Sequence, residues 1–218
     1  MPHDNSLNNL APHGWSGSDK DFLDSSPESI CGQLESFLPD SSPEQHRAWL
    51  ESVKLLKEAV AQWGSWEPKV RSSLVLEYEL PMESRRPDAV IIVGSTIFVI
   101  EFKSKSSLSQ ADLDQADAYG RDLRCYHSVC QVNQVISIAV ATRSHDVQLQ
   151  HDTVNEVSPD KLANFITSEA PLNNAAAIQL DKFLSDSAYR PMPSLIKAAR
   201  ELFQTGNIRP IHRARAAT

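Results

Sequence analysis

The stretch RPDAVIIVGSTIFVIEFK, residues 86–103, decides the fold of this chain. It holds two nearly continuous apolar runs, one over residues 86–94 and one over residues 96–103. Runs of this length that are rich in Val, Ile and Phe are typical of strands covered on both faces. Because Gly94 and Ser95 separate the runs, the stretch predicts a tight hairpin between two buried strands.

Three charged residues interrupt these apolar runs. Asp88 stands at the start of the first strand, and Glu101 and Lys103 stand near the end of the second. The hairpin predicts that Asp88 lies beside Glu101, and the strand period places Lys103 on the same face as Glu101. Two converging carboxylates repel each other and lose hydration, whereas a divalent cation such as Mg²⁺ accepts oxygen ligands and keeps waters. We therefore expect a metal site at Asp88 and Glu101, where Lys103 orients or activates a water and neutralises charge on a phosphorane-like transition state.

The chain before this hairpin predicts two helices and one strand. Residues 27–38 carry apolar side chains at helical spacing, and residues 43–63 do so after Ser42, which opens a Ser-x-x-Gln capping box. Residues 72–80 alternate apolar and polar side chains, as a strand does. The alternation predicts one face with Leu74, Leu76, Tyr78 and Leu80, and the other with Glu77 and Glu79.

The chain after the hairpin predicts a polar helix over residues 108–127 and a buried strand over residues 134–142. The predicted order from residue 42 to residue 142 is α-β-β-β-α-β, which indicates an α/β fold with a mixed sheet flanked by helices. Further helices are expected near residues 159–168, 173–185 and 193–204.

These motifs resemble a known family. Arg86-Pro87-Asp88, followed by Glu101-Phe102-Lys103, resembles the signature of the PD-(D/E)xK nuclease superfamily, and Gln115 with Tyr119 resembles the Gln-x-x-x-Tyr element of its RecB-type members. The resemblance implies a restriction-endonuclease-like core and hydrolysis of phosphodiester bonds in DNA, or less readily RNA, with Mg²⁺ or Mn²⁺. It implies that Asp88 and Glu101 bind the metal, that Lys103 is catalytic, and that Gln115 and Tyr119 face the site.

The likeness extends to the N-terminal nuclease-like region of bacterial proteins in which such a region precedes a P-loop helicase domain. The stretches RAWLESVKLLKEAV, LEYELP, RRPDAVIIVG and LDQADAYGRDL carry it, and it covers nearly the whole chain from about Trp15. A P-loop helicase, as a fused domain or a partner, is therefore implied. The chain itself has no Gly-x-x-x-x-Gly-Lys-Ser/Thr motif, so ATP use is not predicted.

Several further residues are candidates for the site. Arg85 and Arg86 precede the motif and are expected to contact phosphate. An additional acid or polar ligand is expected from the first core helix or from the strand before Asp88. No spacing rule chooses among the helix candidates Gln45, Glu51 and Glu58, and the strand offers Glu77 and Glu79. Of the two strand acids, Glu79 is nearer in sequence to the motif, so we expect it in preference to Glu77.

Other readings of the same residues remain open. Asp88, Glu101 and Lys103 can form a purely structural ion-pair network, and Tyr119 can be a core residue. The protein can then be a non-catalytic nucleic-acid-binding or docking module with the nuclease fold, or a domain that binds and regulates another protein.

Composition and charge limit the classes of protein to which this chain can belong. The 218 residues carry 28 acidic and 21 basic side chains, a formal net charge of -7, so bulk attraction to nucleic acid is excluded. We expect a polar, partly mobile segment over residues 1–26 with a poorly regular second half, one domain over residues 27–204, and a basic tail over residues 205–218. Three cysteines without metal spacing and the lack of a membrane or signal pattern favour a cytoplasmic protein, and a homodimer stays open.

Overall fold

A single mixed sheet organises the chain. The computed structural model describes residues 12–63, 72–80, 85–170 and 177–190. Within these residues, seven strands lie in the order β1-β2-β3-β4-β5-β7-β6. They are antiparallel from β1 to β4, parallel from β4 through β5 to β7, and antiparallel between β7 and β6. The strands are β1 (Trp15–Ser18), β2 (Ser72–Leu76), β3 (Ala89–Val93), β4 (Thr96–Lys103), β5 (Gln134–Ala141), β6 (Gln148–His151) and β7 (Val154–Val157).

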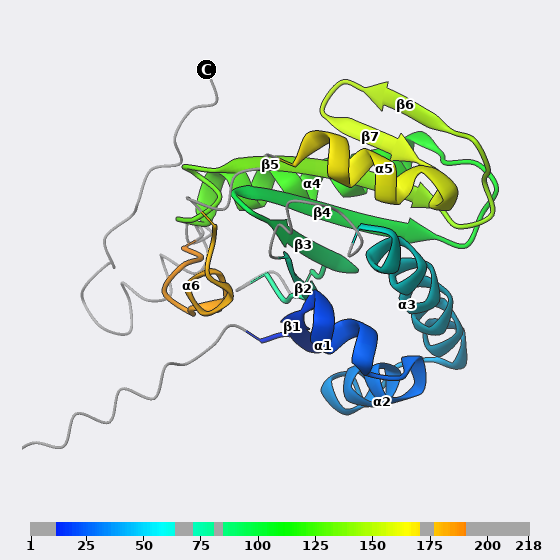
Figure 1. The fold of residues 1–218 in the computed structure, drawn as a ribbon, viewed down its shortest axis with the longest axis horizontal. Coiled ribbons are helices and arrows are strands. Elements are labelled where there is room, and N and C mark those ends of the chain that lie inside the picture. The colour runs from blue at the N-terminus through cyan, green and yellow to red at the C-terminus, as the bar shows by residue number, and fades with distance from the viewer. Residues whose placement is uncertain (1–11, 64–71, 81–84, 171–176, 191–218) are drawn as a thin grey trace, which may run out of the picture.

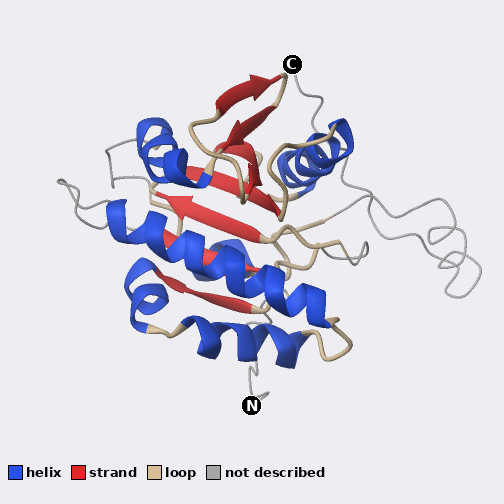
Figure 2. Cartoon of the chain, turned by 90° about the vertical axis from the view of Figure 1, so that its right-hand side faces the viewer, coloured by secondary structure: helices blue, strands red, loops and turns tan. Residues whose placement is uncertain are grey.

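Helices cover both faces of this sheet (Figures 1 and 2). α3 and α5 pack on one face, with α1 and α2 against α3, while α4 and α6 pack on the other. The helices are α1 (Asp19–Asp24), α2 (Pro27–Phe37), α3 (Pro43–Trp63), α4 (Gln110–Tyr126), α5 (Pro159–Glu169) and α6 (Leu180–Leu184). The order α3-β2-β3-β4-α4-β5 confirms the predicted α-β-β-β-α-β arrangement and the α/β class.

Local chemistry accounts for the elements nearest the charged motif. The backbone N–H of Gln45 donates to the Ser42 hydroxyl at 3.2 Å, which satisfies an otherwise unpaired amide at the start of α3. Val93 pairs with Thr96 across a two-residue turn, in which Gly94 has a φ of 60° that only glycine adopts without strain. All of β3 and most of β4 are buried, as the apolar runs predicted.

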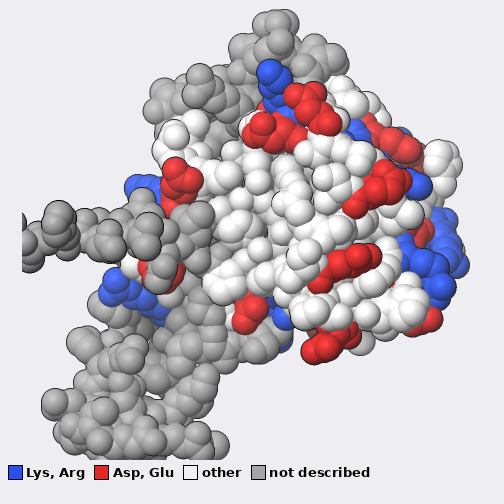
Figure 3. All heavy atoms as spheres, turned by 90° about the horizontal axis from the view of Figure 1, so that it is seen from below, with Lys and Arg blue, Asp and Glu red and all other residues white. Residues whose placement is uncertain are grey.

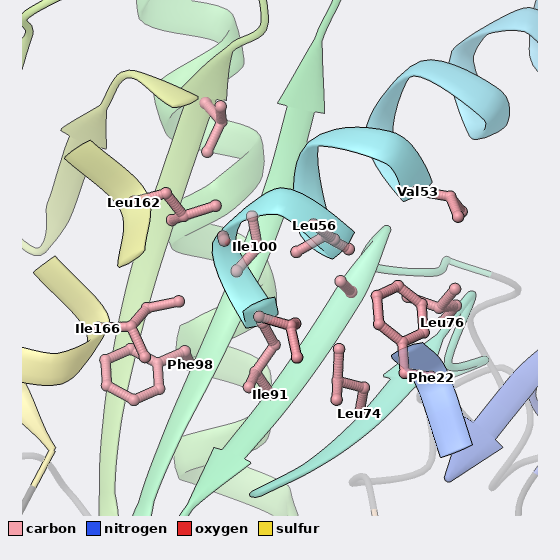
Figure 4. Close-up of a cluster of buried hydrophobic side chains, with 14 of the residues drawn as sticks. Phe22, Val53, Leu56, Leu74, Leu76, Ile91, Phe98, Ile100, Leu162 and Ile166 are labelled. Carbon is pink, nitrogen blue, oxygen red and sulfur yellow. The ribbon is translucent and has the colours of Figure 1, made fainter. Parts of the chain in front are cut away.

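The larger core lies between the sheet and the helices α3 and α5 (Figure 4). Leu56 comes from α3, Leu162 and Ile166 from α5, and Ile91 and Ile100 from β3 and β4. Each of these side chains is at most 1% exposed. Truncation of one of them to Ala typically costs about 2–5 kcal/mol, so this core anchors the elements on which the charged residues stand.

The strand before the motif differs from its prediction. β2 ends at Leu76, and Glu77 has a φ of 51°, in the left-handed region. That conformation reverses the alternation: Leu74 and Leu76 pack with α3, whereas Tyr78 and Leu80 pack in the cluster on the opposite face. The prediction of one shared face for these four side chains was therefore wrong, because a single backbone break shifts the parity of every later residue.

The N-terminal part of the chain also differs. Residues 15–24 were expected to be a poorly regular part of a segment outside the domain, but they form β1 and α1. β1 pairs with β2, and the side chains of Trp15 and Phe22 are buried in the larger core. Residues 15–24 hold too few apolar side chains to show a helical or strand period, so only their packing partners reveal that they belong to the fold.

Beyond residue 145 the predictions held in part. The helix near residues 159–168 is α5. Of the helix expected over residues 173–185, the described residues contain α6, while the helix at 193–204 and the tail at 205–218 lie outside the described residues. The hairpin of β6 and β7 was not predicted, since its strands are short and β6 is mostly exposed.

Charge is unevenly distributed on the surface. Figure 3 views the molecule from the side on which α1 and α2 lie in Figure 1, and acidic side chains are scattered there over a largely uncharged surface. Lys and Arg side chains appear at several edges of that view, with the largest group at its right edge. Among the described helices, none is both long and apolar enough to cross a membrane.

Candidate functional site

The β3–β4 hairpin brings Asp88 and Glu101 together. Ala89 pairs with Ile100, so the next pair outward along the hairpin is Asp88 and Glu101. The backbone N–H of Phe102 donates to Oδ2 of Asp88 at 2.7 Å, which holds this carboxylate against β4. The turn length therefore determines the meeting of the two acids, as the sequence predicted.

Lys103 and Gln115 form a hydrogen-bonded network on Glu101. Nζ of Lys103 donates to Oε1 of Glu101 at 2.9 Å and to Oε1 of Gln115 at 2.9 Å. Nε2 of Gln115 donates to the same Glu101 oxygen at 2.8 Å and to the hydroxyl of Tyr119 at 3.1 Å. One helical turn of α4 thus supplies both Gln115 and Tyr119, and the sequence-predicted set from Asp88 to Tyr119 meets at one place.

The electrostatics of this set favour binding of a cation. Burial raises the pKa of Asp88 well above its ordinary value, and the charges of Glu101 and Glu77 raise it further. Burial also raises the pKa of Glu101, although Lys103 opposes the shift. Burial lowers the pKa of Lys103, but Glu101 outweighs it and the net shift is upward, so Lys103 stays a cation at neutral pH.

These side chains line an open cavity of about 640 Å³. Its wall includes all five residues of the predicted set, and both Arg85 and Arg86. The opposite wall comes from α3 and includes Gln45 and Trp49. The volume lies within the roughly 300–1,000 Å³ that is usual for ligand pockets, so the charged groups face a space that admits a substrate.

Glu77 is the acid that joins the site from the strand side. Its Oε1 accepts from the Trp49 indole N–H at 2.7 Å, and its Oε2 accepts from Nε of Arg86 at 3.1 Å. Burial raises the pKa of Glu77, which these two hydrogen bonds oppose. Glu77 lines the cavity, whereas Glu79, which the sequence favoured over Glu77, is not among its lining residues.

The sequence carried little signal for Glu77. An acid between two apolar strand residues is what ordinary alternation places on the solvent side, so only the structure reveals that Glu77 is buried. Regular alternation sends Glu77 and Glu79 to the same face, and only the left-handed φ at Glu77 separates them. Non-glycine residues in this conformation concentrate at functional sites, where surrounding contacts hold the strain.

The remaining candidates have different positions. Thr142 donates to Oε1 of Glu51 at 2.7 Å and Ser104 donates to Oε2, so Glu51 is bound behind two residues of the cavity wall. Burial raises the pKa of Glu51, but these hydrogen bonds outweigh it and lower the pKa overall. Glu58 is exposed and is not among the lining residues. Arg85 forms an ion pair with Asp122 and lies over the Tyr119 ring, 5.8 Å from its centroid.

The donor set of Asp88 and Glu101 fits a hard divalent cation. Oε2 of Glu101 is buried and has no hydrogen-bond partner among the described residues, and an unpaired buried anionic oxygen is costly unless a ligand satisfies it. No group of three or more His, Cys, Asp or Glu side chains is placed for a metal in the described part of the chain. An ion bound by Asp88 and Glu101 would take waters and substrate oxygens as its other ligands, which is usual for Mg²⁺.

Comparisons with known proteins leave the family open. No protein-family model matches the chain, and no curated protein matches it. One solved structure that is similar, the crystal structure of protein VC1899 from Vibrio cholerae, has 17% identity and a TM-score of 0.33. The match covers 66% of this chain and 44% of that one, so the chain spans less than half of that structure's length. A likeness this low carries no argument about fold or function.

Proposed function

We propose that this chain is a Mg²⁺- or Mn²⁺-dependent nuclease that hydrolyses phosphodiester bonds in DNA, as the resemblance to PD-(D/E)xK nucleases implies. One observation carries the proposal. Asp88, Glu101 and Lys103 converge, with Gln115 bridging Lys103 and Glu101, on the wall of an open cavity of about 640 Å³. Acids that repel each other in a partly dry site are costly to the fold, which is typical of residues retained for chemistry.

Each residue has a distinct role in this proposal. Asp88 and Glu101 bind the divalent cation, which supplies polarisation of the phosphate and an activated water when bound. Lys103, held by Glu101 and Gln115, presents a positive charge to the phosphate as negative charge develops on its oxygens. Gln115 orients both Lys103 and Glu101, and the hydroxyl of Tyr119 holds Gln115 in turn. Arg86, oriented by Glu77, contacts a phosphate of the bound strand.

The direct test is DNA cleavage by matched lysine variants. Plasmid, linear duplex and single-stranded DNA are incubated with the protein and Mg²⁺ or Mn²⁺. We expect Lys103→Ala and excess chelator each to reduce cleavage by about 100-fold or more, since removal of a preorganised charged group commonly costs that much. Lys105→Ala is the control, because Lys105 pairs with Asp112 and is not among the lining residues. Cleavage that survives both Lys103→Ala and chelator rules out the proposed chemistry.

Metal binding separates the nuclease from its non-catalytic alternative. Calorimetry with Mn²⁺ is expected to show one binding event in the wild-type protein and none in Asp88→Asn or Glu101→Gln. Nucleic-acid retention without cleavage and without metal affinity would instead assign the chain as a binding or docking module. A P-loop helicase partner is consistent with either result and is tested by co-purification.

A further inference from the structure

A second cavity adjoins the candidate site. It has a volume of about 380 Å³, and four of its lining residues, Ser42, Gln45, Glu77 and Arg86, also line the larger cavity. The two spaces therefore meet along the first turn of α3 and the Glu77–Arg86 ion pair. In Figure 1 the α2–α3 connection and the C-terminal end of β4 lie on the same side of the molecule, in agreement with this continuity.

The second cavity has one wall that the larger cavity lacks. It consists of four consecutive residues of the α2–α3 connection, namely Leu38, Pro39, Asp40 and Ser41. The first two are apolar, while Asp40 and Ser41 add a carboxylate and a hydroxyl. The other lining residues of this cavity are polar or charged, so its apolar surface comes from Leu38 and Pro39.

Contacts with α3 hold this connection in place. Nε2 of His46 and the Ser41 hydroxyl form a hydrogen bond of 2.7 Å, and Nδ1 of His46 lies 3.1 Å from Oε1 of Glu35. The His46 ring also stacks on Trp49, with ring centroids 5.4 Å apart, and Trp49 donates to Glu77. The wall of the second cavity is thus tied through α3 to the acid that separates the two cavities.

We propose that the second cavity binds the unpaired base of a nucleotide next to the phosphodiester that is cut. This inference rests on the proposed nuclease function and adds a substrate class to it. The carboxylates of Asp40 and Glu77 disfavour a phosphate inside the cavity, whereas an uncharged base can stack on Leu38 and Pro39 and hydrogen-bond with Ser42 and Gln45. Arg86 stands where the cavities meet, so the phosphate that joins the two nucleotides lies at a positive charge.

This placement has a consequence for the substrate. A base that stacks on Leu38 and Pro39 and hydrogen-bonds with Ser42 and Gln45 cannot stay paired, because these side chains occupy the edge that its pairing partner would use. Duplex DNA would have to unstack and unpair at the cut, which disfavours it relative to a single strand. The preferred substrate is therefore single-stranded nucleic acid or an unpaired end.

Cleavage of short oligonucleotides tests the subsite. The wild-type protein with Mn²⁺ is given a single strand, the matching blunt duplex, and single strands with one abasic position on either side of the cut. We expect faster cleavage of the single strand, and a loss of at least about fivefold in kcat/KM for one abasic position, since base stacking on protein is typically worth that much or more. Asp40→Trp should fill the cavity and remove the abasic effect, whereas Gln33→Trp, on the exposed surface of α2, should leave it.

A binding measurement in chelator keeps the two proposals separable. Deoxycytidine or deoxyadenosine is titrated into isotope-labelled protein, with deoxyribose as the comparison. The amide shifts of residues 38–45 other than Pro39 and Pro43 are followed by NMR. Shifts confined to this segment, and lost in Asp40→Trp, support the subsite even if the protein cuts no DNA. The subsite is overturned if blunt duplex is cut as fast as the single strand and abasic positions have no effect, or if the nucleosides cause no amide shift. Either result leaves the proposed nuclease function standing.

Discussion

Replacement of Asp88 by Asn is expected to stabilise the metal-free protein at neutral pH. Asp88 is partly buried and lies opposite Glu101, with Glu77 also near enough to raise its pKa. Asn keeps an oxygen that can accept from the Phe102 N–H, which now donates at 2.7 Å. The substitution therefore removes a repelled charge and retains the hydrogen bond that positions the side chain.

The size of the effect follows from the geometry of the hairpin. Side chains at opposite positions of antiparallel strands have Cβ atoms about 5 Å apart. Two unit charges at that separation repel by about 3 kcal/mol at an effective dielectric constant of ~20. Lys103, which lies 2.9 Å from Glu101, offsets part of this repulsion. We expect a net gain of about 1–2 kcal/mol, which corresponds to a rise in Tm of about 2–8 °C for a chain of this size.

The pH dependence has a definite sign. Because the pKa of Asp88 is raised in the native state, the native protein holds a proton that the unfolded chain has already released above its ordinary pKa of ~3.9. The free energy of unfolding of the wild type therefore falls as the pH rises through this interval. The stabilisation by Asp88→Asn should be full above the native pKa of Asp88 and should vanish toward pH ~3.9, where both states are protonated.

Thermal unfolding in chelator, followed by circular dichroism at several pH values, checks this prediction. Asp186→Asn is the control, since Asp186 is exposed and its neutralisation should change Tm little at any pH. Saturating Mn²⁺ should reverse the order, because the wild type gains a bound ion that Asp88→Asn loses. If Asp88→Asn is neutral or destabilising in chelator at pH 7.5, the two acids are not in conflict and the electrostatic argument for a cation site fails.

Two further predictions concern the packing of α4 on the sheet and the buried His127. Gly120→Ala would place a Cβ 2.0 Å from the Ser137 hydroxyl oxygen, so urea denaturation should show a loss of about 1–3 kcal/mol in the free energy of unfolding. Gly32→Ala, with open space around it, should be neutral or stabilising, and equal effects of the two substitutions would refute the packing argument. Burial lowers the pKa of His127 to about 4, so the free energy of unfolding should fall by about 3 kcal/mol from pH ~6.5 to ~4. His127→Gln, which can still donate to the Phe183 carbonyl, should lose this acid sensitivity. If the free energy of unfolding of His127→Gln falls with pH as steeply as that of the wild type, the role of His127 is refuted.

The sequence predicted the centre of the candidate site well because its geometry is local. A two-residue turn at Gly94 and Ser95 determines which residue of β3 faces which residue of β4. Strand period then places Lys103 with Glu101, and helical spacing places Gln115 with Tyr119. These relations need only the chain between residues 88 and 119, where the elements were correctly identified.

The sequence predicted the rim of the site poorly because its geometry is not local. Glu77 reaches the cavity through one left-handed residue, which no alternation pattern reveals. The second cavity forms where the α2–α3 connection lies near Glu77 and Arg86, which are distant from it in the chain.

The sequence by itself determined the α/β class, the order of the core elements and the pairing of Asp88 with Glu101, because periodicity and turn chemistry act between near neighbours in the chain. Only the tertiary structure decided that residues 15–24 form β1 and α1 and join the fold, that Glu77 rather than Glu79 lines the cavity, and that two cavities meet at Arg86. Those features arise from packing between distant segments, where burial and shape select one arrangement among many that the local pattern permits.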